Sequence, residues 1–191
     1  MIKSILLPAL LACIVSTSAH AALNEGDVAP AFDTQASLAG KAFNYSLADA
    51  LKKGPVVVYF YPSAYTGGCN LQAHTFAVNQ EKFAAAGVSI VGVSLDSIKR
   101  LNDFSADPDY CAGKIPVASD LDGKIAKSYA LNIRAGTAGR KDTRGVDIDH
   151  DFAERTTFIV TPNGKVASVI GGLAPEANVA KALDVAQHLS K

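Results

Sequence analysis

The amino-acid sequence predicts an α/β fold in which helices flank a central mixed β-sheet. Two continuous apolar runs, Val56–Tyr61 and Val88–Leu95, have the length and β-branched content of strands buried on both faces. A segment with helical periodicity follows each run, and the C-terminal third adds a hairpin and a last helix. This order of elements is typical of a layered sheet that contains both parallel and antiparallel strands.

The other elements follow from local signals along the chain. Phe43–Leu47 alternates as a short strand does, and Ser46 can cap a helix that runs to Leu51. The helix after Val56–Tyr61 has one apolar face and should end at Gly87. Further on, the sequence predicts a helix over 97–107 that Pro108 ends, a strand over 115–118 and a short helix up to Tyr129. A long surface loop over 132–151 follows. The chain then forms strands over 156–161 and 166–170, joined by a turn, and a last helix from Pro175.

Length and charge limit the classes of function. The chain has 191 residues, of which 49% are hydrophobic, which suits one well-buried domain over residues 22–191. Eighteen basic residues balance 18 acidic ones, and the sequence shows no basic stripe. We therefore expect no nucleic-acid partner.

Residues 1–21 have the features of a cleavable signal peptide. Lys3 precedes the apolar run Ile5–Val15, which is shorter than the ~20 residues that span a bilayer, and Ala19-His20-Ala21 fits a cleavage site. A buried N-terminal helix is the alternative. A lipoprotein signal at Cys13 is another, but the apolar run continues past that cysteine, which favours ordinary cleavage. The sequence thus predicts export to the oxidising periplasm with no stable membrane association.

Cleavage would leave two cysteines, Cys69 and Cys111. In an exported protein, such a pair most often forms a structural disulfide. The surroundings of Cys69 support a catalytic reading as well. Cys69 follows Val56–Tyr61 and Pro62 at the start of the next helix, where the partial positive charge of the helix N-terminus favours the ionised thiolate.

Four other residues can complete a site around Cys69. Thr66, three positions earlier, can place its hydroxyl beside the sulfur or cap the helix. Arg155 stands at the entry to the 156–161 strand, and neighbouring strands of a sheet end close together, so its guanidinium can hold a thiolate. Pro62 can shield the sulfur from water, and Gln72 can help orient the helix.

These residues resemble the peroxiredoxin family. The stretch Pro62–Cys69 matches the signature P-x-x-x-T-x-x-C, and Glu154–Val160 is similar to the arginine-bearing strand of that family. Gly54–Pro62 and Val88–Ser94 resemble the flanking strands, so the resemblance covers nearly all of the chain after residue 21. It is strongest to the bacterioferritin comigratory protein, or peroxiredoxin Q, subgroup, and it implies a thioredoxin-like fold.

The resemblance also implies a role for each site residue. Cys69 would be the peroxidatic cysteine, which attacks the peroxide O–O bond and becomes a sulfenic acid. Thr66 would hydrogen-bond the peroxide and the thiolate, Arg155 would stabilise both, and Pro62 would pack over the pocket. Main-chain N–H groups near Gly68 and Cys69 would bind the charge that develops on oxygen.

Cys111 is similar in position to the resolving cysteine that some relatives carry in the following helix, before a P-x-x-S-D segment. Pro116–Asp120 matches that segment, whereas His74 occupies the place of the resolving cysteine in other relatives. The resemblance therefore implies a Cys69–Cys111 disulfide. Because a disulfide needs Cα atoms within roughly 7 Å, we hypothesise that both cysteine segments unravel to form it.

The activity implied is a thiol-dependent peroxidase that reduces hydrogen peroxide and organic hydroperoxides, needs no cofactor or metal, and works as a monomer. Its reductant would be a thioredoxin-like protein or a small thiol.

Two other functions remain open at this point. A thiol–disulfide oxidoreductase would normally carry C-x-x-C, but Thr66 replaces the first cysteine. A periplasmic copper chaperone could bind through Cys69 and a histidine, but it lacks the paired cysteines that soft metals favour. His74, His150 and His188 have no metal-site spacing, and we expect them at the surface or at a pocket rim.

Overall fold

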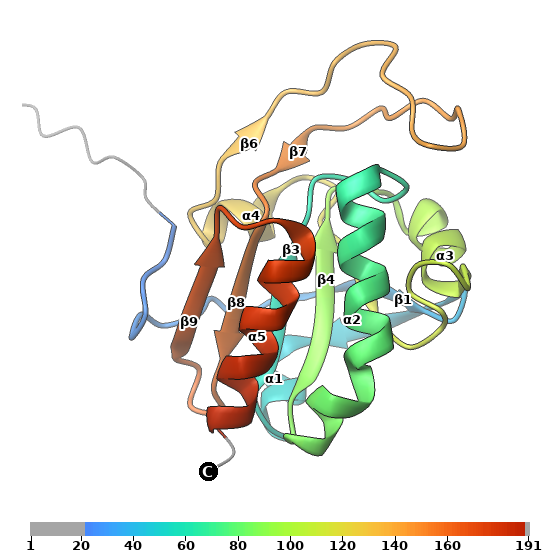
Figure 1. Cartoon of the computed structure of the whole chain (residues 1–191). Coiled ribbons are helices and arrows are strands. Elements are labelled where there is room, and N and C mark those ends of the chain that lie inside the picture. The colour runs from blue at the N-terminus through green and yellow to red at the C-terminus, as the bar shows by residue number, and fades with distance from the viewer. Residues whose placement is uncertain (1–21, 190–191) are drawn as a thin grey trace, which may run out of the picture.

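The computed structural model describes residues 22–189, in which one seven-stranded mixed sheet carries helices on both faces (Figure 1). The predicted signal peptide, with Cys13, lies outside the described residues. In chain order the elements are β1 (Asp33–Leu38), β2 (Lys41–Ser46), α1 (Leu47–Leu51), β3 (Val56–Phe60), α2 (Gly67–Ala85), β4 (Ser89–Ser94), α3 (Ile98–Ala106), β5 (Val117–Ser119), α4 (Lys124–Ser128), β6 (Ile133–Arg134), β7 (Phe152–Ala153), β8 (Thr156–Val160), β9 (Val166–Gly171) and α5 (Pro175–Leu189).

The strand order is β2-β1-β5-β4-β3-β8-β9. β3 pairs in parallel with β4, and β4 with β5, whereas β8 and β9 are antiparallel. All five residues of β3 and all five of β8 are buried, which explains their unbroken apolar and β-branched sequences. The predicted mixed sheet is confirmed.

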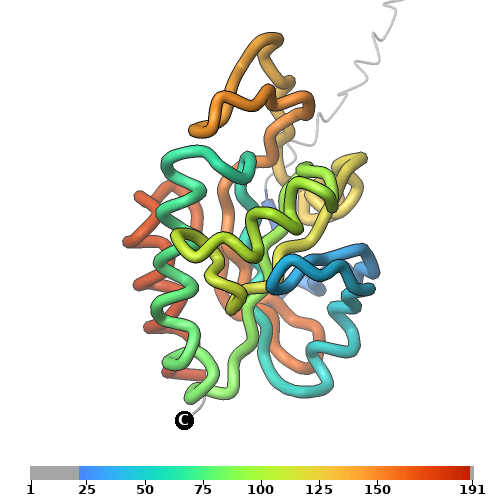
Figure 2. The backbone as a smooth tube through the Cα atoms, turned by 90° about the vertical axis from the view of Figure 1, so that its right-hand side faces the viewer, coloured from blue at the N-terminus to red at the C-terminus, as the bar shows by residue number. Residues whose placement is uncertain are grey.

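Two hydrophobic clusters hold the helices to the sheet. α2, α3 and α5 cover one face, where Tyr59, Phe76, Leu101 and Val179 belong to one cluster (Figures 1 and 2). α1 and α4 pack on the other face through a second cluster that includes Leu47 and Ala126. Alternate residues of β3 point to opposite faces and so join both clusters.

Local signals fixed the ends of several elements as predicted. Ser46 accepts a hydrogen bond from the Asp49 backbone N–H and caps α1. α2 ends with Gly87 in the left-handed region at φ +70°, and the Val88 N–H reaches back to the Phe83 carbonyl at 2.9 Å. That glycine and that six-residue hydrogen bond are the marks of a Schellman ending.

Three parts of the fold differ from the sequence predictions. β1 was not predicted, because its sequence Asp33–Leu38 is mostly polar; it pairs with β2 through a tight turn in which Ala39 and Gly40 both have positive φ. The 132–151 segment is not only loop, since β6 pairs with β7 at its ends and Lys141 bridges to Asp147. Cys111 lies beyond α3, in a run of turns, and not on the helix.

Among residues 22–189, no helix has the length and apolar character needed to cross a bilayer.

Candidate active site

Cys69 is the third residue of α2, as predicted, and its side chain is buried with 2% of the residue exposed. Thr66 occupies the N-cap position, with extended backbone angles. The Cys69 N–H donates to the Thr66 carbonyl at 2.9 Å. The sulfur, a free thiol here, therefore lies at the positive end of a 19-residue helix.

Arg155 contacts this sulfur directly. Its Nη2 donates to the Cys69 Sγ at 3.3 Å. The contact follows from sheet register, because β8 pairs with β3 such that Thr156 faces Phe60, and Arg155 precedes Thr156 at the end where β3 finishes. Gly68 makes room for it, since a Cβ there would lie 3.2 Å from the same Nη2. The predicted meeting of Arg155 and Cys69 is confirmed.

A buried chain of amide and hydroxyl groups fixes the orientation of Arg155. Its Nη1 donates to Gln72 Oε1, one turn after Cys69 on α2. Gln72 Nε2 donates to Asn178 Oδ1 at 3.1 Å, and Thr157 Oγ1 donates to the same oxygen at 2.7 Å. Asn178 Nδ2 completes the chain on the Ile170 carbonyl at 3.0 Å. Gln72, Thr157 and Asn178 are fully buried, so α2, β8, β9 and α5 all position the guanidinium.

The remaining predicted groups are arranged differently from the prediction. The Thr66 hydroxyl donates to the Ser63 carbonyl at 2.9 Å, and it neither caps α2 nor contacts Cys69 among the bonds of the described residues. The Cys69 N–H, expected to face the developing charge, is already bonded to Thr66. To donate to a peroxide or to the thiolate, as the sequence suggested, both groups would have to leave these partners.

Pro62 and Arg155 line a cavity of about 480 Å³ beside the site. Its other walls come from Glu154, Ala153 and two residues at the start of the 132–151 segment, Asn132 and Arg134. That segment extends over the end of the molecule where α2 begins (Figures 1 and 2). The cavity combines apolar groups with two guanidinium groups and the Glu154 carboxylate, which suits a small polar molecule that carries an apolar substituent.

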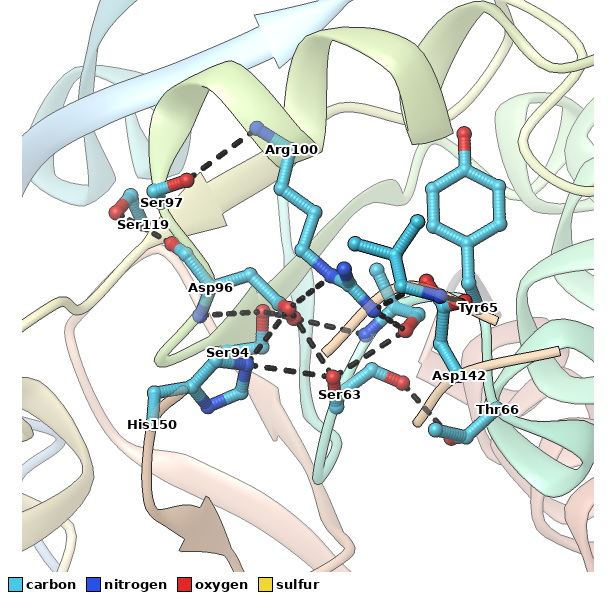
Figure 3. Close-up of polar contacts among 12 residues, drawn as sticks. Ser63, Tyr65, Thr66, Ser94, Asp96, Ser97, Arg100, Ser119, Asp142 and His150 are labelled. Atoms are coloured by element: carbon cyan, nitrogen blue, oxygen red, sulfur yellow. Dashed lines mark hydrogen bonds and ion pairs between the residues drawn. The ribbon is translucent and has the colours of Figure 1, made fainter. Parts of the chain in front are cut away.

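Asp96 anchors the loop that leads from β3 to Cys69. This carboxylate is fully buried just after β4, and Figure 3 shows it at the centre of a polar network. It accepts from the Ala64 N–H at 2.8 Å and from Ser63 Oγ at 3.1 Å, both in the stretch between Pro62 and Cys69. Arg100 Nε lies 2.9 Å from it and neutralises its charge. No local pattern indicates this anchor, because Ser63 and Ala64 lie 33 and 32 positions before Asp96 in the chain.

His150 joins the same network from the 132–151 segment. Nε2 donates to Asp96 Oδ1 at 2.8 Å, and Nδ1 donates to the Asp151 carbonyl at 2.7 Å. Both ring nitrogens can donate only in the protonated imidazole. Burial alone would lower the pKa of His150, but the hydrogen bond and charge of Asp96 raise that pKa above its usual value. We expected His150 at the surface or at a pocket rim, and it does line a cavity. Its buried carboxylate partner, Asp96, was not predicted.

Cys111 is fully buried in the same hydrophobic cluster as Cys69, and both are free thiols. Burial, and secondarily the charge of Asp107, raises the pKa of the Cys111 thiol far above its ordinary value. The protonated thiol is a poor nucleophile. In this form of the protein the buried, protonated Cys111 is therefore expected to react slowly. His74, which is exposed on α2, donates through Nδ1 to the Asp109 carbonyl of the Cys111 turns at 3.0 Å.

The sequence from residue 26 to 169 matches the model of the AhpC/TSA family. The chain belongs to the AhpC/TSA family. A Mycobacterium tuberculosis protein named as a peroxiredoxin is 35% identical over 159 residues, which cover 83% of this chain and 92% of that protein. The chloroplastic peroxiredoxin Q of Oryza sativa subsp. japonica is 29% identical over 170 residues, or 87% of this chain and 68% of the relative. These relatives confirm the resemblance, and the chain is a peroxiredoxin enzyme.

Solved structures agree with this assignment. The peroxidoxin BcpB of Mycobacterium tuberculosis superposes with a TM-score of 0.72 at 27% identity, covering 87% of this peroxiredoxin and 98% of that chain. The bacterioferritin comigratory protein of Xanthomonas campestris, described for its alkyl peroxide reduction activity, gives a TM-score of 0.66 at 27% identity over 90% of this chain and all of that one. The thioredoxin-like α/β fold is confirmed.

Proposed function

We propose that this peroxiredoxin is an exported thiol peroxidase in which Cys69 reduces hydrogen peroxide and organic hydroperoxides and Cys111 resolves the product. The contact of Arg155 Nη2 with the Cys69 Sγ, at 3.3 Å at the N-terminus of α2, is the observation that carries the proposal. A guanidinium and a helix N-terminus both favour a thiolate over a thiol. The thiolate is the form of cysteine that attacks an O–O bond.

In the first step the Cys69 sulfur attacks one peroxide oxygen and the O–O bond breaks. Cys69 becomes a sulfenic acid, and the other oxygen leaves with a proton as water or an alcohol. The Arg155 guanidinium has more N–H donors than its contacts with Cys69 and Gln72 use. It can therefore also donate to the departing oxygen. The adjoining cavity of about 480 Å³ has room for the substituent of an organic hydroperoxide.

In the second step the Cys111 sulfur attacks the sulfur of the sulfenic acid. A Cys69–Cys111 disulfide forms and water leaves. The burial of Cys111 and the raised pKa of its thiol argue that its turns must open before this attack. A thioredoxin-like protein or a small thiol then reduces the disulfide, and the protein completes the cycle as a monomer.

The experiment that tests this function mixes the reduced protein with one equivalent of hydrogen peroxide, follows the rate, and maps the product by peptide mass. Oxidation of Cys69 orders of magnitude faster than that of a free thiol, followed by a Cys69–Cys111 disulfide, is expected. Oxidation at the rate of a free thiol would instead remove the peroxidase assignment.

Substitution of Cys111 by serine is expected to leave the oxidation of Cys69 as fast as in the wild type. Within residues 22–189 the Arg155 guanidinium bonds to Cys69 and Gln72, and Cys111 is not among its hydrogen-bond partners. The sulfenic acid should then accumulate, since no second thiol removes it. A dimedone-type probe followed by mass spectrometry measures that accumulation. Normal turnover with the same reductant would show that Cys111 does not resolve.

Export to the periplasm is supported by the basic, apolar and small-residue segments of residues 1–21. Expression of the full chain in a bacterial host should give a periplasmic protein whose N-terminal sequence starts at Ala22. N-terminal sequencing of each cell fraction makes the test. A membrane-bound protein that still contains Met1 or Cys13 would contradict cleavage at this site.

A further inference from the structure

Tyr65 has an unusual backbone conformation in the loop between Pro62 and Cys69. Its φ is +59°, in the left-handed region that bulky residues seldom occupy. Such a conformation persists only where the surrounding structure holds it. Here Thr143, from the 132–151 segment, holds the Tyr65 carbonyl with two hydrogen bonds, from its N–H at 2.9 Å and from its Oγ1 at 3.0 Å.

The Tyr65 ring is enclosed by cations and aromatic rings. The Arg144 guanidinium lies over its face at 3.2 Å from the ring centroid, and the Arg100 guanidinium lies at 5.6 Å. Phe104 and Tyr110 meet it edge to face at 5.1 and 5.6 Å. Only 2% of Tyr65 is exposed. We call these five residues the Tyr65 cluster.

The Tyr65 cluster ties the two cysteine segments together. Tyr65 lies four residues before Cys69, and Tyr110 is the neighbour of Cys111 in the chain. Tyr110 also stacks on Phe104 of α3 at 5.4 Å. The ring of Tyr65 therefore contacts the Cys111 turns directly through Tyr110 and indirectly through Phe104. Neither segment can leave its folded position without breaking ring contacts with the other.

A buried carboxylate holds the cationic side of the cluster. Asp142 Oδ2 lies 2.7 Å from Arg100 Nη2 and 2.9 Å from Arg144 Nη2. The Asp142 side chain is fully buried, and Arg100 also donates to the Ala64 carbonyl at 3.0 Å, next to Tyr65. The 132–151 segment thus supplies Asp142, Thr143 and Arg144 to the closed arrangement.

We propose that Tyr65 is a positioning residue whose cluster keeps both cysteine segments closed and thereby sets the rate of disulfide formation. The proposal rests on the proposed resolving role of Cys111. After the sulfenic acid forms, the cluster must open so that Cys111 Sγ can bond to Cys69 Sγ, with the S–O bond breaking and the hydroxyl leaving as water. While the cluster is closed, a second peroxide molecule can instead oxidise the sulfenic acid to sulfinic acid. The cluster therefore governs sensitivity to peroxide excess.

Arg144→Gln tests the proposal, because it removes the cation from the Tyr65 face at a residue outside the peroxide site. Arg140→Gln is the matched control, since Arg140 lies in the same segment but its guanidinium lies over the ring of Phe152, at 4.9 Å, and not over Tyr65. Stopped-flow mixing with one equivalent of hydrogen peroxide, with acid quenching and mass spectrometry, separates the rate of sulfenic acid formation from that of disulfide formation.

Arg144→Gln is expected to form the disulfide about fivefold faster, with unchanged Cys69 oxidation and less sulfinic acid at high peroxide, because a lost cation–π contact favours the open form. Arg140→Gln should match the wild type. Tyr65→Leu should accelerate disulfide formation as well, whereas Tyr65→Phe, which keeps the ring, should not. Thermal unfolding of each variant checks that it is folded.

An unchanged disulfide rate in both Arg144→Gln and Tyr65→Leu would overturn the proposal. The proposal would also be overturned if the rate of Cys69 oxidation fell by as large a factor as the rate of disulfide formation changed. The cluster would then be needed for the structure of the peroxide site itself. Absence of the Cys69–Cys111 disulfide in the wild-type protein is a different result, which removes the resolving role of Cys111 itself.

Discussion

Substitution of Cys69 by serine is expected to reduce peroxide turnover to the uncatalysed background. A serine hydroxyl ionises far less readily than a thiol, and its oxygen has no sulfenic acid to form, so neither the attack nor the oxidised product is available. Consumption of hydrogen peroxide in the presence of a thiol reductant measures the effect. Because serine is close to cysteine in size, the buried position of residue 69 should remain packed and the protein folded.

The same variant tests whether Cys111 reacts on its own. In it, Cys111 is the single thiol among residues 22–189, and burial raises its pKa. It should therefore resist peroxide and alkylating reagents until the protein is unfolded. Rapid peroxide consumption by Cys69→Ser would place the peroxidatic function on Cys111 and contradict the assignment.

Substitution of Arg155 by alanine is expected to slow oxidation of Cys69 by about 10²–10³-fold, the effect of losing one preorganised charged donor at a reacting centre. The free energy of unfolding should fall by only about 1–3 kcal/mol, because Gln72 Oε1 loses its donor inside the protein. Rapid mixing with hydrogen peroxide gives the rate, and urea unfolding gives the stability. Arg155→Lys should recover little, since an ammonium group cannot reproduce the planar two-sided contact with Cys69 and Gln72.

Arg134→Ala is the control for Arg155→Ala. Arg134 lines the same cavity but is exposed and makes no contact with Cys69 among the bonds of the described residues. Its removal changes the charge near the site by the same amount without touching the sulfur. Equal slowing in the two variants would mean that general positive charge, and not the directed guanidinium, supports the reaction.

The parts of the fold and site that the sequence predicted are those with local signals. The apolar run of β3, the glycine that ends α2 and the serine that caps α1 each act over a few residues. Arg155 could be assigned to Cys69 because strand neighbours share an end of the sheet, and this topological rule needs no side-chain detail.

The parts that were missed depend on tertiary contacts. Asn178 sits within an apolar helix stripe, and its function appears only when α5 packs beside α2 and faces Gln72. The aromatic and cationic partners of Tyr65 come from α3, the Cys111 turns and the 132–151 segment, which no sequence period relates. The hydrogen bond from the Thr66 hydroxyl to the Ser63 carbonyl, three residues away, was also not predicted, and it leaves the role of Thr66 toward a peroxide a prediction.

The hydrogen-bonded chain that orients Arg155 makes the site depend on a helix that carries none of the reacting atoms. Asn178 lies on α5, the last of the described elements, and Gln72 and Thr157 share its side-chain oxygen. If α5 left the sheet, Cys69 would stay on α2, but Gln72 would lose the partner that holds it against the Arg155 guanidinium. Damage to the packing of α5 is therefore expected to slow the oxidation of Cys69 even where β3 and α2 remain folded.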